Sequence, residues 1–404
     1  MTGYPLDKIS IKGFRSIKEL DNFPLSGLNV LIGANGSGKS NFLEVFKLVK
    51  AISQNKLQEY TRDIGNPEHL FFNGVGETDT IEIGVGFGEN NYTYKLRANP
   101  EVSGGIYLVG GEYSKDYQYS DESVKPDTAK YQVHDDIEDS FSGRDTSASS
   151  QLHQQGNYGS IYATKDAAFN VNELIDSWMI YDFHNTDNNS LLRGEWSVND
   201  ITLHSSGRNL APFLMNLRDH HPFNYKRFIN HVRVVMPIFG DCLFKPTKQA
   251  NGEETVGLEW RHKNSEFVMH SSQISDGILK FMALVACLDQ PHPPATIVLD
   301  GPESGLHHFA AEIFGDMLTV EKETPANIKT SQIIAATQST NFINPLDPED
   351  IITVNNFGKG SEFKRVNKEE LGVWLDNYSL GGLWYKNVIE ALSWDIETIK
   401  SLQG

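Results

Sequence analysis

Cysteine and long apolar runs are both scarce in this sequence of 404 residues. Cys242 and Cys287 are too few for a disulfide framework or a zinc cluster, and they suit a reducing compartment. A membrane helix needs about 20 consecutive apolar residues, and no run approaches that length. The first residues, MTGYPLDKISIKGF, also lack the apolar core of a secretory leader. We therefore expect a cytoplasmic protein without a membrane partner.

Basic residues are also in the minority. Lys and Arg number 35 against 53 Asp and Glu, which gives a net charge of −18. Such a chain repels the phosphates of DNA and of acidic membranes. A broad electrostatic grip on DNA is therefore not expected, although DNA binding through a local basic patch stays open.

The spacing of apolar residues predicts an α/β protein. Strands are expected at 7–14, 26–33, 80–87, 91–98, 295–300 and 331–337, and helices at 41–52, 209–219, 223–235, 275–290 and 309–320. Strands that alternate with helices favour a parallel sheet covered by helices. The length allows one large domain or two to three ordinary ones.

The stretch GANGSGKS (33–40) matches the phosphate-loop pattern G-x-x-x-x-G-K-[ST]. Its glycines let backbone N–H groups point at phosphate oxygens, and the helix that follows presents its positive end. In this pattern Lys39 reaches the β and γ phosphates and Ser40 binds magnesium. The predicted nucleotide-binding residues are Gly33, Ala34, Asn35, Gly36, Ser37, Gly38, Lys39 and Ser40.

Two further stretches fit the same site. In IVLDGPESGLHH (297–308), Asp300 ends an apolar strand, where its carboxylate can hold the water shell of the magnesium opposite Ser40. In ISDGILK (274–280), Ser275 and Gly277 begin a helix and offer a hydroxyl, free N–H groups and a dipole to an anion. The first loop already serves one γ phosphate, so this second helix end predicts a nucleotide held between two copies of the chain. An ordinary N-cap by Ser275 is the alternative.

These motifs in this order, with IKGFRSIKEL before them and ATQSTNF (336–342) after them, resemble ABC-type ATPases related to RecF, SMC proteins and OLD nucleases. More narrowly, they resemble stand-alone bacterial AAA family ATPases often encoded in phage-defence regions, which also share YDFHNT (181–186), GRNLAPFLMNLRDHHP (207–222) and WLDNYSLGGLW (374–384). The resemblance implies an ABC-type P-loop ATPase head with a mixed-sheet lobe, a helical lobe and no long coiled coil. It also implies ATP and Mg²⁺ as ligands, a homodimer or an assembly of dimers, and a separate effector protein such as a nuclease.

The resemblance assigns roles to individual residues. Ser275, Asp276 and Gly277 become the signature that meets the partner's ATP, and residues 304–307 become the loop that crosses the dimer interface. Arg15 lies where relatives often place a nucleotide-contacting basic residue, and an ordinary surface arginine is the alternative. The catalytic set is Lys39, Asp300, Glu303 and Gln338.

Two positions depart from the family pattern. ABC proteins generally carry a histidine at the position of Gln338, whose amide can still donate a hydrogen bond to a γ phosphate. Relatives have a glutamate at the position of Gly301, which cannot accept a proton. A general base contributes about 10²- to 10⁴-fold to a rate, so we expect firm ATP binding with slow hydrolysis. Glu303 is a candidate to replace the missing base.

We expect four parts: an ATPase lobe with the phosphate loop (1–111), an acidic, mobile insertion (112–158), a helical part and second lobe with the signature, the magnesium acid and the switch (159–360), and a helical extension (361–404). Two alternatives stay open. One is a RecF-like DNA-repair ATPase, and the other is a non-hydrolysing assembly protein that keeps ATP as a structural ligand.

Overall fold

The computed structural model describes residues 5–99, 105–115, 128–132, 165–186, 190–323 and 330–391. They form two compact units. Unit 1 holds the chain up to Trp178 and takes up Ile352–Arg365, whereas unit 2 holds Met179–Ile351 and Val366–Glu390. We expected the second lobe to begin at residue 159, whereas unit 2 begins at Met179. Residues 352–365 belong to unit 1 together with the amino-terminal part of the chain.

Unit 1 contains a six-stranded antiparallel sheet in the order β2-β1-β4-β5-β6-β7. Its strands are β1 Lys8–Phe14, β2 Ile17–Pro24, β4 Thr80–Phe87, β5 Asn90–Asn99, β6 Gly105–Lys115 and β7 Thr128–Gln132. Alternation buries Ile9 and Ile11 on one face while Ser10 and Lys12 lie on the other. Strand β7 lies within the predicted insertion (112–158) and forms an edge of this sheet. Residues 116–127 and 133–158, for which we predicted mobility, lie outside the described residues.

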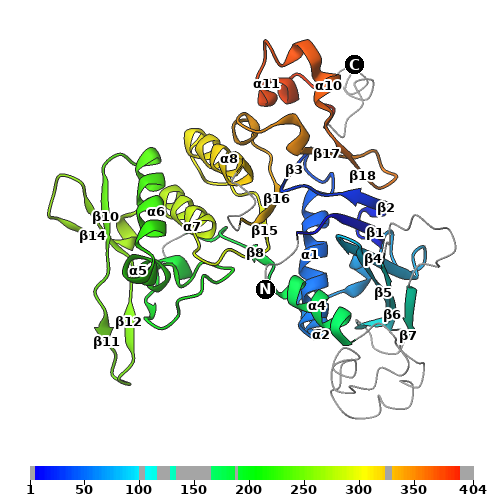
Figure 1. The fold of residues 1–404 in the computed structure, drawn as a ribbon, viewed down its shortest axis with the longest axis horizontal. Helices are drawn as coiled ribbons and strands as arrows, with labels where there is room; N and C mark the ends of the chain where they lie inside the picture. Colours follow the sequence, from blue (N-terminus) through cyan, green and yellow to red (C-terminus); the bar gives the residue numbers. More distant parts are fainter. Residues whose placement is uncertain are drawn as a thin grey trace. The chain divides into compact units, whose positions relative to one another are not determined.

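The phosphate loop joins strand β3 (Leu28–Ile32) to helix α1 (Lys39–Ser53). All five residues of β3 are buried, and β3 lies beside β17 (Ile351–Asn356). Phe46 of α1 packs against Trp178 with 5.3 Å between ring centroids. Helices α2 (Leu57–Ile64) and α4 (Lys165–Asp176) lie beside α1 (Figure 1), and a short helical turn spans Pro67–Leu70.

Strand β18 (Ser361–Arg365) pairs antiparallel with β17. The prediction that the chain is helical from residue 361 is therefore wrong for these five residues. The physical reason is alternation: Phe363 faces the core and contacts Phe42 at 5.3 Å between centroids, whereas Glu362 and Lys364 are exposed.

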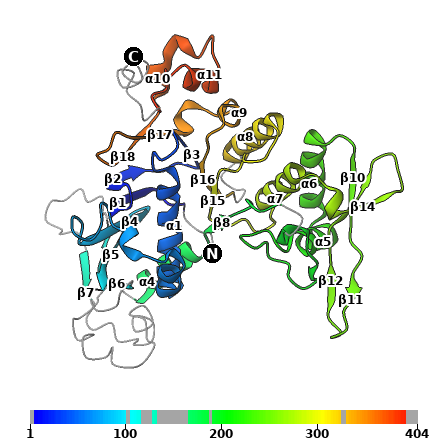
Figure 2. The same ribbon diagram turned by 180° about the vertical axis from the view of Figure 1, so that it is seen from behind.

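Unit 2 contains the parallel strands β16 (Gln332–Ala336), β15 (Thr296–Asp300) and β8 (Met179–Tyr181). Its larger helices are α5 Leu210–His220, α6 Pro222–Val235, α7 Asp276–Leu288 and α8 His308–Glu323. Its short strands are β9 Trp196–Ser197, β10 Phe239–Leu243, β11 Thr247–Lys248, β12 Glu254–Val256, β13 Glu259–His262 and β14 Val268–His270. Its short helices and turns are Leu191–Arg193, Ser271–Gln273, α9 Thr340–Ile343, Pro348–Asp350, α10 Lys368–Leu371, Gly372–Trp374 and α11 Leu380–Tyr385. Figures 1 and 2 both show the β11–β12 hairpin extending beyond helix α5.

The core of unit 2 centres on helix α7, where every residue from Leu279 to Leu288 is buried. Helices α5, α6 and α8 each pack against it. In the described part of the chain, no helix combines the length and the apolar character needed to cross a bilayer.

Candidate nucleotide site

The phosphate loop has a conformation that only glycine permits at two positions. A Cβ on Gly38, whose φ is 113°, would lie 2.1 Å from Ser361 Oγ, and a Cβ on Gly33 would lie 2.2 Å from Val354 O. The Lys39 ammonium donates to Gly33 O at 2.8 Å and to Ala34 O at 2.9 Å. These contacts hold the buried lysine against its own loop, which is therefore shaped in advance of ligand binding.

The donors of the loop suit a triphosphate and its magnesium. The Ser37 hydroxyl is buried without a hydrogen-bond partner among the described residues. Ser40 is exposed in the first turn of α1, where backbone N–H groups have no helical acceptor. Anions bind such helix ends, and hydroxyl oxygens are ligands for Mg²⁺. The groups that the loop presents are thus suited to phosphate and magnesium, and the roles of its residues remain predictions.

A chain of hydroxyl contacts, which the sequence did not reveal, ties the loop to its surroundings. Asn41 Nδ2 donates to Ser16 Oγ at 2.7 Å, and Ser16 Oγ lies 2.7 Å from Ser361 Oγ. Ser361 Oγ in turn donates to Ser37 O at 2.6 Å. Ser16 and Ser361 are 345 positions apart, so no local pattern could pair them.

Arg15 lines a cavity of about 400 Å³ beside the phosphate loop. The other lining residues are Ser16, Asn41, His69, Phe72, Asn73, Asn356, Gly358 and Gly360. The Arg15 guanidinium lies 3.9 Å from Glu44, and its Nε is buried without a described partner. Tyr60 also donates to Glu44, and burial raises the pKa of Tyr60, which keeps its hydroxyl protonated. A nucleotide contact by Arg15 stays a prediction.

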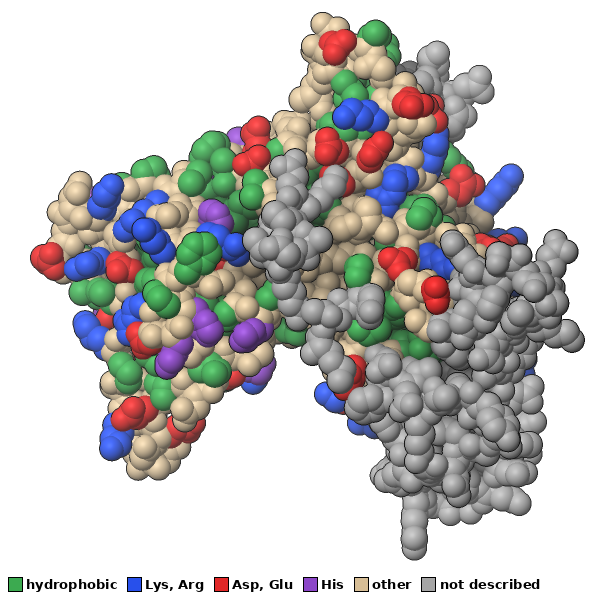
Figure 3. Space-filling view, in the orientation of Figure 1, with side chains coloured by type: hydrophobic (Ala, Val, Ile, Leu, Met, Phe, Trp, Pro, Cys, Tyr) green, Lys and Arg blue, Asp and Glu red, His purple; other side chains and the backbone are tan. Residues whose placement is uncertain are grey.

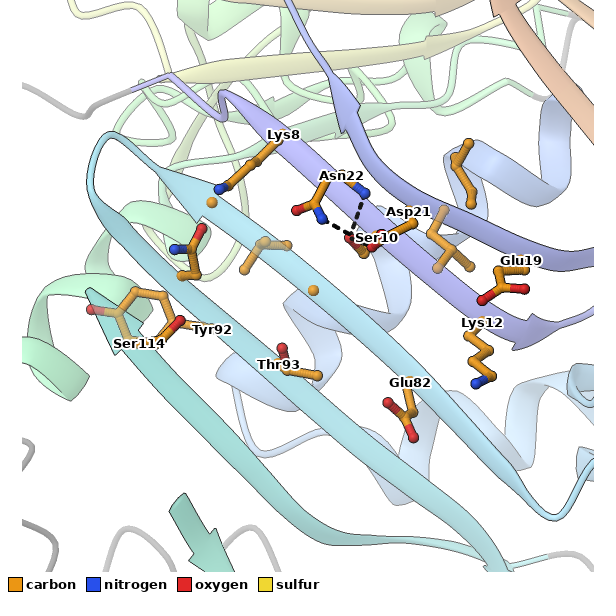
Figure 4. A pocket seen from close by; sticks show the side chains of 16 residues that line it. Lys8, Ser10, Lys12, Glu19, Asp21, Asn22, Glu82, Tyr92, Thr93 and Ser114 are labelled. Carbon is orange, nitrogen blue, oxygen red and sulfur yellow. Dashed lines mark hydrogen bonds between the residues drawn. The ribbon is translucent and has the colours of Figure 1, made fainter. Parts of the chain in front are cut away.

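A second, larger cavity of about 610 Å³ lies on the outer face of the antiparallel sheet (Figure 4). Gly84 and Gly86 of β4 line this cavity, and because they have no side chains the sheet surface is hollowed there. Lys12 stands opposite Glu19 on one neighbouring strand and Glu82 on the other. Carboxylates on both sides offset the charge of this lysine, so the groove does not favour a nucleic-acid backbone.

In unit 2, a buried lysine holds the turn that follows β15. Asp300 is the only exposed residue of that strand. Lys280 of helix α7 donates to Gly301 O at 3.2 Å and to Ser304 O at 2.8 Å. Burial lowers the pKa of Lys280, and the carboxylate of Glu303 opposes that change. The single lysine within the otherwise apolar stretch ILKFMALVACL (278–288) is the sequence signal for this contact.

Glu303 connects the ends of β15 and β16. Its Oε1 accepts the backbone N–H of Gln338 at 2.9 Å, and its Oε2 is buried without a described partner. This hydrogen bond holds the Gln338 loop, and the Glu303 side chain is partly exposed. Gly301 has a φ of 53°, in the left-handed region, and donates its N–H to Ala336 O at 2.9 Å. The role of Glu303 as the replacement base stays a prediction.

The signature begins helix α7. Ser275 occupies the N-cap position, but its side chain makes no capping hydrogen bond and is exposed. The plain N-cap alternative thus lacks its defining contact. A Cβ on Gly277 would lie 2.8 Å from Gly305 O, so glycine permits the close approach of the signature to the 304–307 loop.

Arg193 holds the start of helix α7, where the signature lies. No sequence pattern predicted this role. Its side chain is only 5% exposed. It donates to the carbonyls of Ser271 and Ile274, and it forms an ion pair with Asp276. A buried guanidinium with several hydrogen-bond acceptors has little conformational freedom. The backbone that carries the exposed Ser275 hydroxyl is therefore held in place.

Other charged stretches have structural partners. Arg227 pairs with the buried Asp289, and Arg233 donates to Phe239 O and Gly240 O. In KRFINHVR (226–233), two of the three basic side chains that could touch a phosphate backbone are thus held by contacts within the fold. No cluster of three or more His, Cys, Asp or Glu placed to hold a metal occurs within the described ranges. Of the tail tryptophans, Trp384 is buried, Trp374 is 46% exposed, and Trp394 lies outside the described residues.

The phosphate loop and the α/β fold define an ABC-type P-loop ATPase. The chain belongs to the AAA family described as "AAA domain, putative AbiEii toxin, Type IV TA system", whose profile matches residues 28–344.

Several individual proteins are similar to this chain or to a part of it. The DNA replication and repair protein RecF of Vibrio atlanticus is 40% identical over 84 residues, which are 20% of this chain and 23% of that protein. The match thus spans about a quarter of this curated relative. An SMC head bound to the C-terminal winged-helix domain of ScpA has a TM-score of 0.50 at 15% identity, covering 91% of this chain and 98% of that one. The SMC head of Thermotoga maritima has a TM-score of 0.42 at 15% identity, covering 90% and 99%.

Proposed function

We propose that the protein binds Mg-ATP, closes into a homodimer around two nucleotides, and hydrolyses ATP slowly while it acts as a sensor or scaffold for a separate effector. The start of helix α7 carries this proposal. Its Ser275 hydroxyl is exposed and not used as a cap, while Arg193 and Gly277 hold the helix end in place. A rigid, uncapped helix end suits the phosphate of a nucleotide bound to a second copy.

In this proposal each group of residues contacts a different part of Mg-ATP. Backbone N–H groups of the loop and Lys39 hold the phosphates, and Ser40 and Asp300 hold the magnesium. When bound, the magnesium ion neutralises charge on the β and γ phosphate oxygens. Gln338 is exposed at the end of β16 and can donate to the γ phosphate. Because Gly301 has no side chain, hydrolysis lacks the usual carboxylate base and is slow.

In this proposal the effector is a separate polypeptide, a nuclease in anti-phage defence. The SMC head among the structural neighbours is bound to a domain of ScpA, a separate protein. In this chain, the rings of Trp374 and Tyr378 lie 5.9 Å apart and are 46% and 40% exposed. Exposed aromatic side chains of this kind are common at protein interfaces.

Size-exclusion chromatography with and without Mg-ATP tests the dimer. We expect the wild type to shift from monomer to dimer only with Mg-ATP, because the signature needs the nucleotide of the other copy. Ser275→Arg should bind ATP normally but remain monomeric, since its bulk and charge lie at the helix end. Tyr385→Ala, an exposed change in α11, is the matched control and should dimerise. A wild-type protein that binds Mg-ATP and stays monomeric would contradict the proposal.

Arg193→Ala should weaken the dimer without weakening nucleotide binding to the phosphate loop. It removes the guanidinium that holds Asp276 and the carbonyl of Ile274. The carbonyls of Ser271 and Ile274 also lose their donor, and an acceptor left without a partner destabilises the fold, so the thermal midpoint should also fall. Arg193→Lys keeps the charge but loses the forked geometry, and it should recover stability more than dimerisation. Equal recovery of both would show that Arg193 only supports the fold.

A RecF-like role in DNA binding has less support. The chain carries an excess of acids, and Lys12 in the large groove is flanked by carboxylates. Figure 3 shows Lys and Arg mixed with Asp and Glu on the visible face around helices α5 and α6. Binding to duplex DNA that requires ATP and weakens steeply with salt would restore this alternative.

A further inference from the structure

The segment YDFHNT (181–186) has no role in the site described so far, yet it lies against the turn at Gly301. Strand β8 runs parallel to β15, and Tyr181 pairs with Leu299. The chain therefore leaves β8 beside the carboxyl end of β15, where Asp300 and Gly301 lie. Side chains that follow neighbouring parallel strands meet at this edge of a sheet.

His184 occupies the space next to the missing side chain. A Cβ built on Gly301 would lie 3.6 Å from Cε1 of His184, which is ordinary contact distance. The ring is exposed, and no described residue forms a hydrogen bond with either of its nitrogens. An imidazole thus stands at the position toward which a residue at 301 would extend, with its nitrogens available to water.

The residues on both sides of His184 are anchored. Phe183 is buried, with its ring 5.3 Å from that of Tyr181, and the absence of a side chain on Gly207 lets the two segments approach closely. The His184 N–H donates to Asp182 Oδ1 at 3.2 Å. Beyond the histidine, Arg193 Nε donates to Thr186 O at 3.1 Å. The histidine backbone is therefore held in place relative to the turn.

We propose that His184 accepts the proton of the attacking water, in place of the carboxylate that Gly301 lacks. The proposal rests on the ATPase function proposed above. The water oxygen forms a bond to the γ phosphorus while its proton passes to a ring nitrogen of neutral His184. The bond between the γ phosphorus and the bridging oxygen breaks, and ADP leaves with that electron pair. The imidazolium then returns its proton to solvent. General-base assistance of this kind contributes about 10²- to 10⁴-fold.

The first test compares Lys39-dependent phosphate release in the wild type, His184→Ala and His184→Gln. Both variants should lose at least about tenfold in kcat, at the cautious end of the general-base range. Glutamine retains polarity and size but cannot take the proton. His220→Ala, on the exposed end of α5, is the matched control and should leave kcat unchanged. ATP affinity and the thermal midpoint should not change in any of these variants.

A binding measurement provides a readout independent of turnover. ADP with aluminium fluoride and magnesium mimics the transferring phosphoryl group with its attacking water. His184→Ala should weaken the binding of this mixture about tenfold while leaving ATPγS binding unchanged, because only interactions specific to the transition state are lost. Equal binding of the analogue by both proteins would overturn the proposal.

A double variant separates a base from a nearby structural group. In a Gly301→Glu background, His184→Ala should cost less than threefold in kcat, because the new carboxylate takes the proton. The same loss in both backgrounds contradicts the proposal, as does a wild-type kcat that His184→Gln retains. If the wild type binds no ATP, the proposed function fails first. If it turns ATP over in a Lys39-dependent way but His184→Ala leaves kcat unchanged, only the role of His184 fails. If it binds ATP without any Lys39-dependent turnover, the proposed hydrolysis fails as well.

Discussion

Lys39→Ala is expected to lower kcat/KM for ATP by roughly 10²- to 10³-fold, the usual effect of removing one donor to a developing phosphate charge. The lysine is buried and bonded to two carbonyls of its own loop, Gly33 O and Ala34 O. Alanine removes the ammonium and also leaves these carbonyls without their donor. Calorimetry with Mg-ATP and steady-state phosphate release should therefore both show the loss.

Lys47→Ala is the matched control on the same helix. Its side chain is 48% exposed and pairs only with Glu44 among the described residues, so ATP affinity and turnover should stay near wild type. Nucleotide binding by Lys39→Ala at the wild-type level would mean that the loop does not bind phosphate as its motif predicts.

Gly301→Glu is expected to raise kcat by at least about tenfold over the wild type, because it adds a carboxylate base at position 301 beside His184; the figure is again at the cautious end of the general-base range. The space exists, because a Cβ at this position meets only His184 Cε1 at 3.6 Å and Ser304 Cβ at 3.8 Å. The backbone is less favourable, since a φ of 53° lies in the left-handed region. A non-glycine residue there costs about 1–2 kcal/mol, so the variant should be faster but less stable.

Gly301→Gln separates the two effects. It has the same size and the same backbone strain as glutamate but cannot act as a base. Phosphate release and thermal unfolding should show equal destabilisation of the two variants and a higher kcat only for glutamate. If Gln and Glu give the same kcat, the missing carboxylate does not limit hydrolysis in this protein.

Several features were predictable because they are local. The phosphate loop, strand β15 ending in Asp300, and helix α7 beginning after Ser275 all lie where their patterns placed them. Each follows from short-range periodicity and from residue types with a specific backbone preference. The expected helix from residue 361 was wrong because five residues of alternating sequence form β18, and such short segments are decided by the strand they pair with.

The sequence by itself determined the class of protein and the chemical groups at its phosphate loop, because glycines, a lysine and a serine at fixed spacing suffice to define a phosphate-binding turn. Only the tertiary structure decided which groups surround Gly301. Lys280 holds the turn, Glu303 is bound to the Gln338 backbone, and His184 lies beside the missing side chain. The physical reason is that parallel strands distant in sequence end at one edge of a sheet, and the contacts made there depend on the register between strands, which no local pattern encodes.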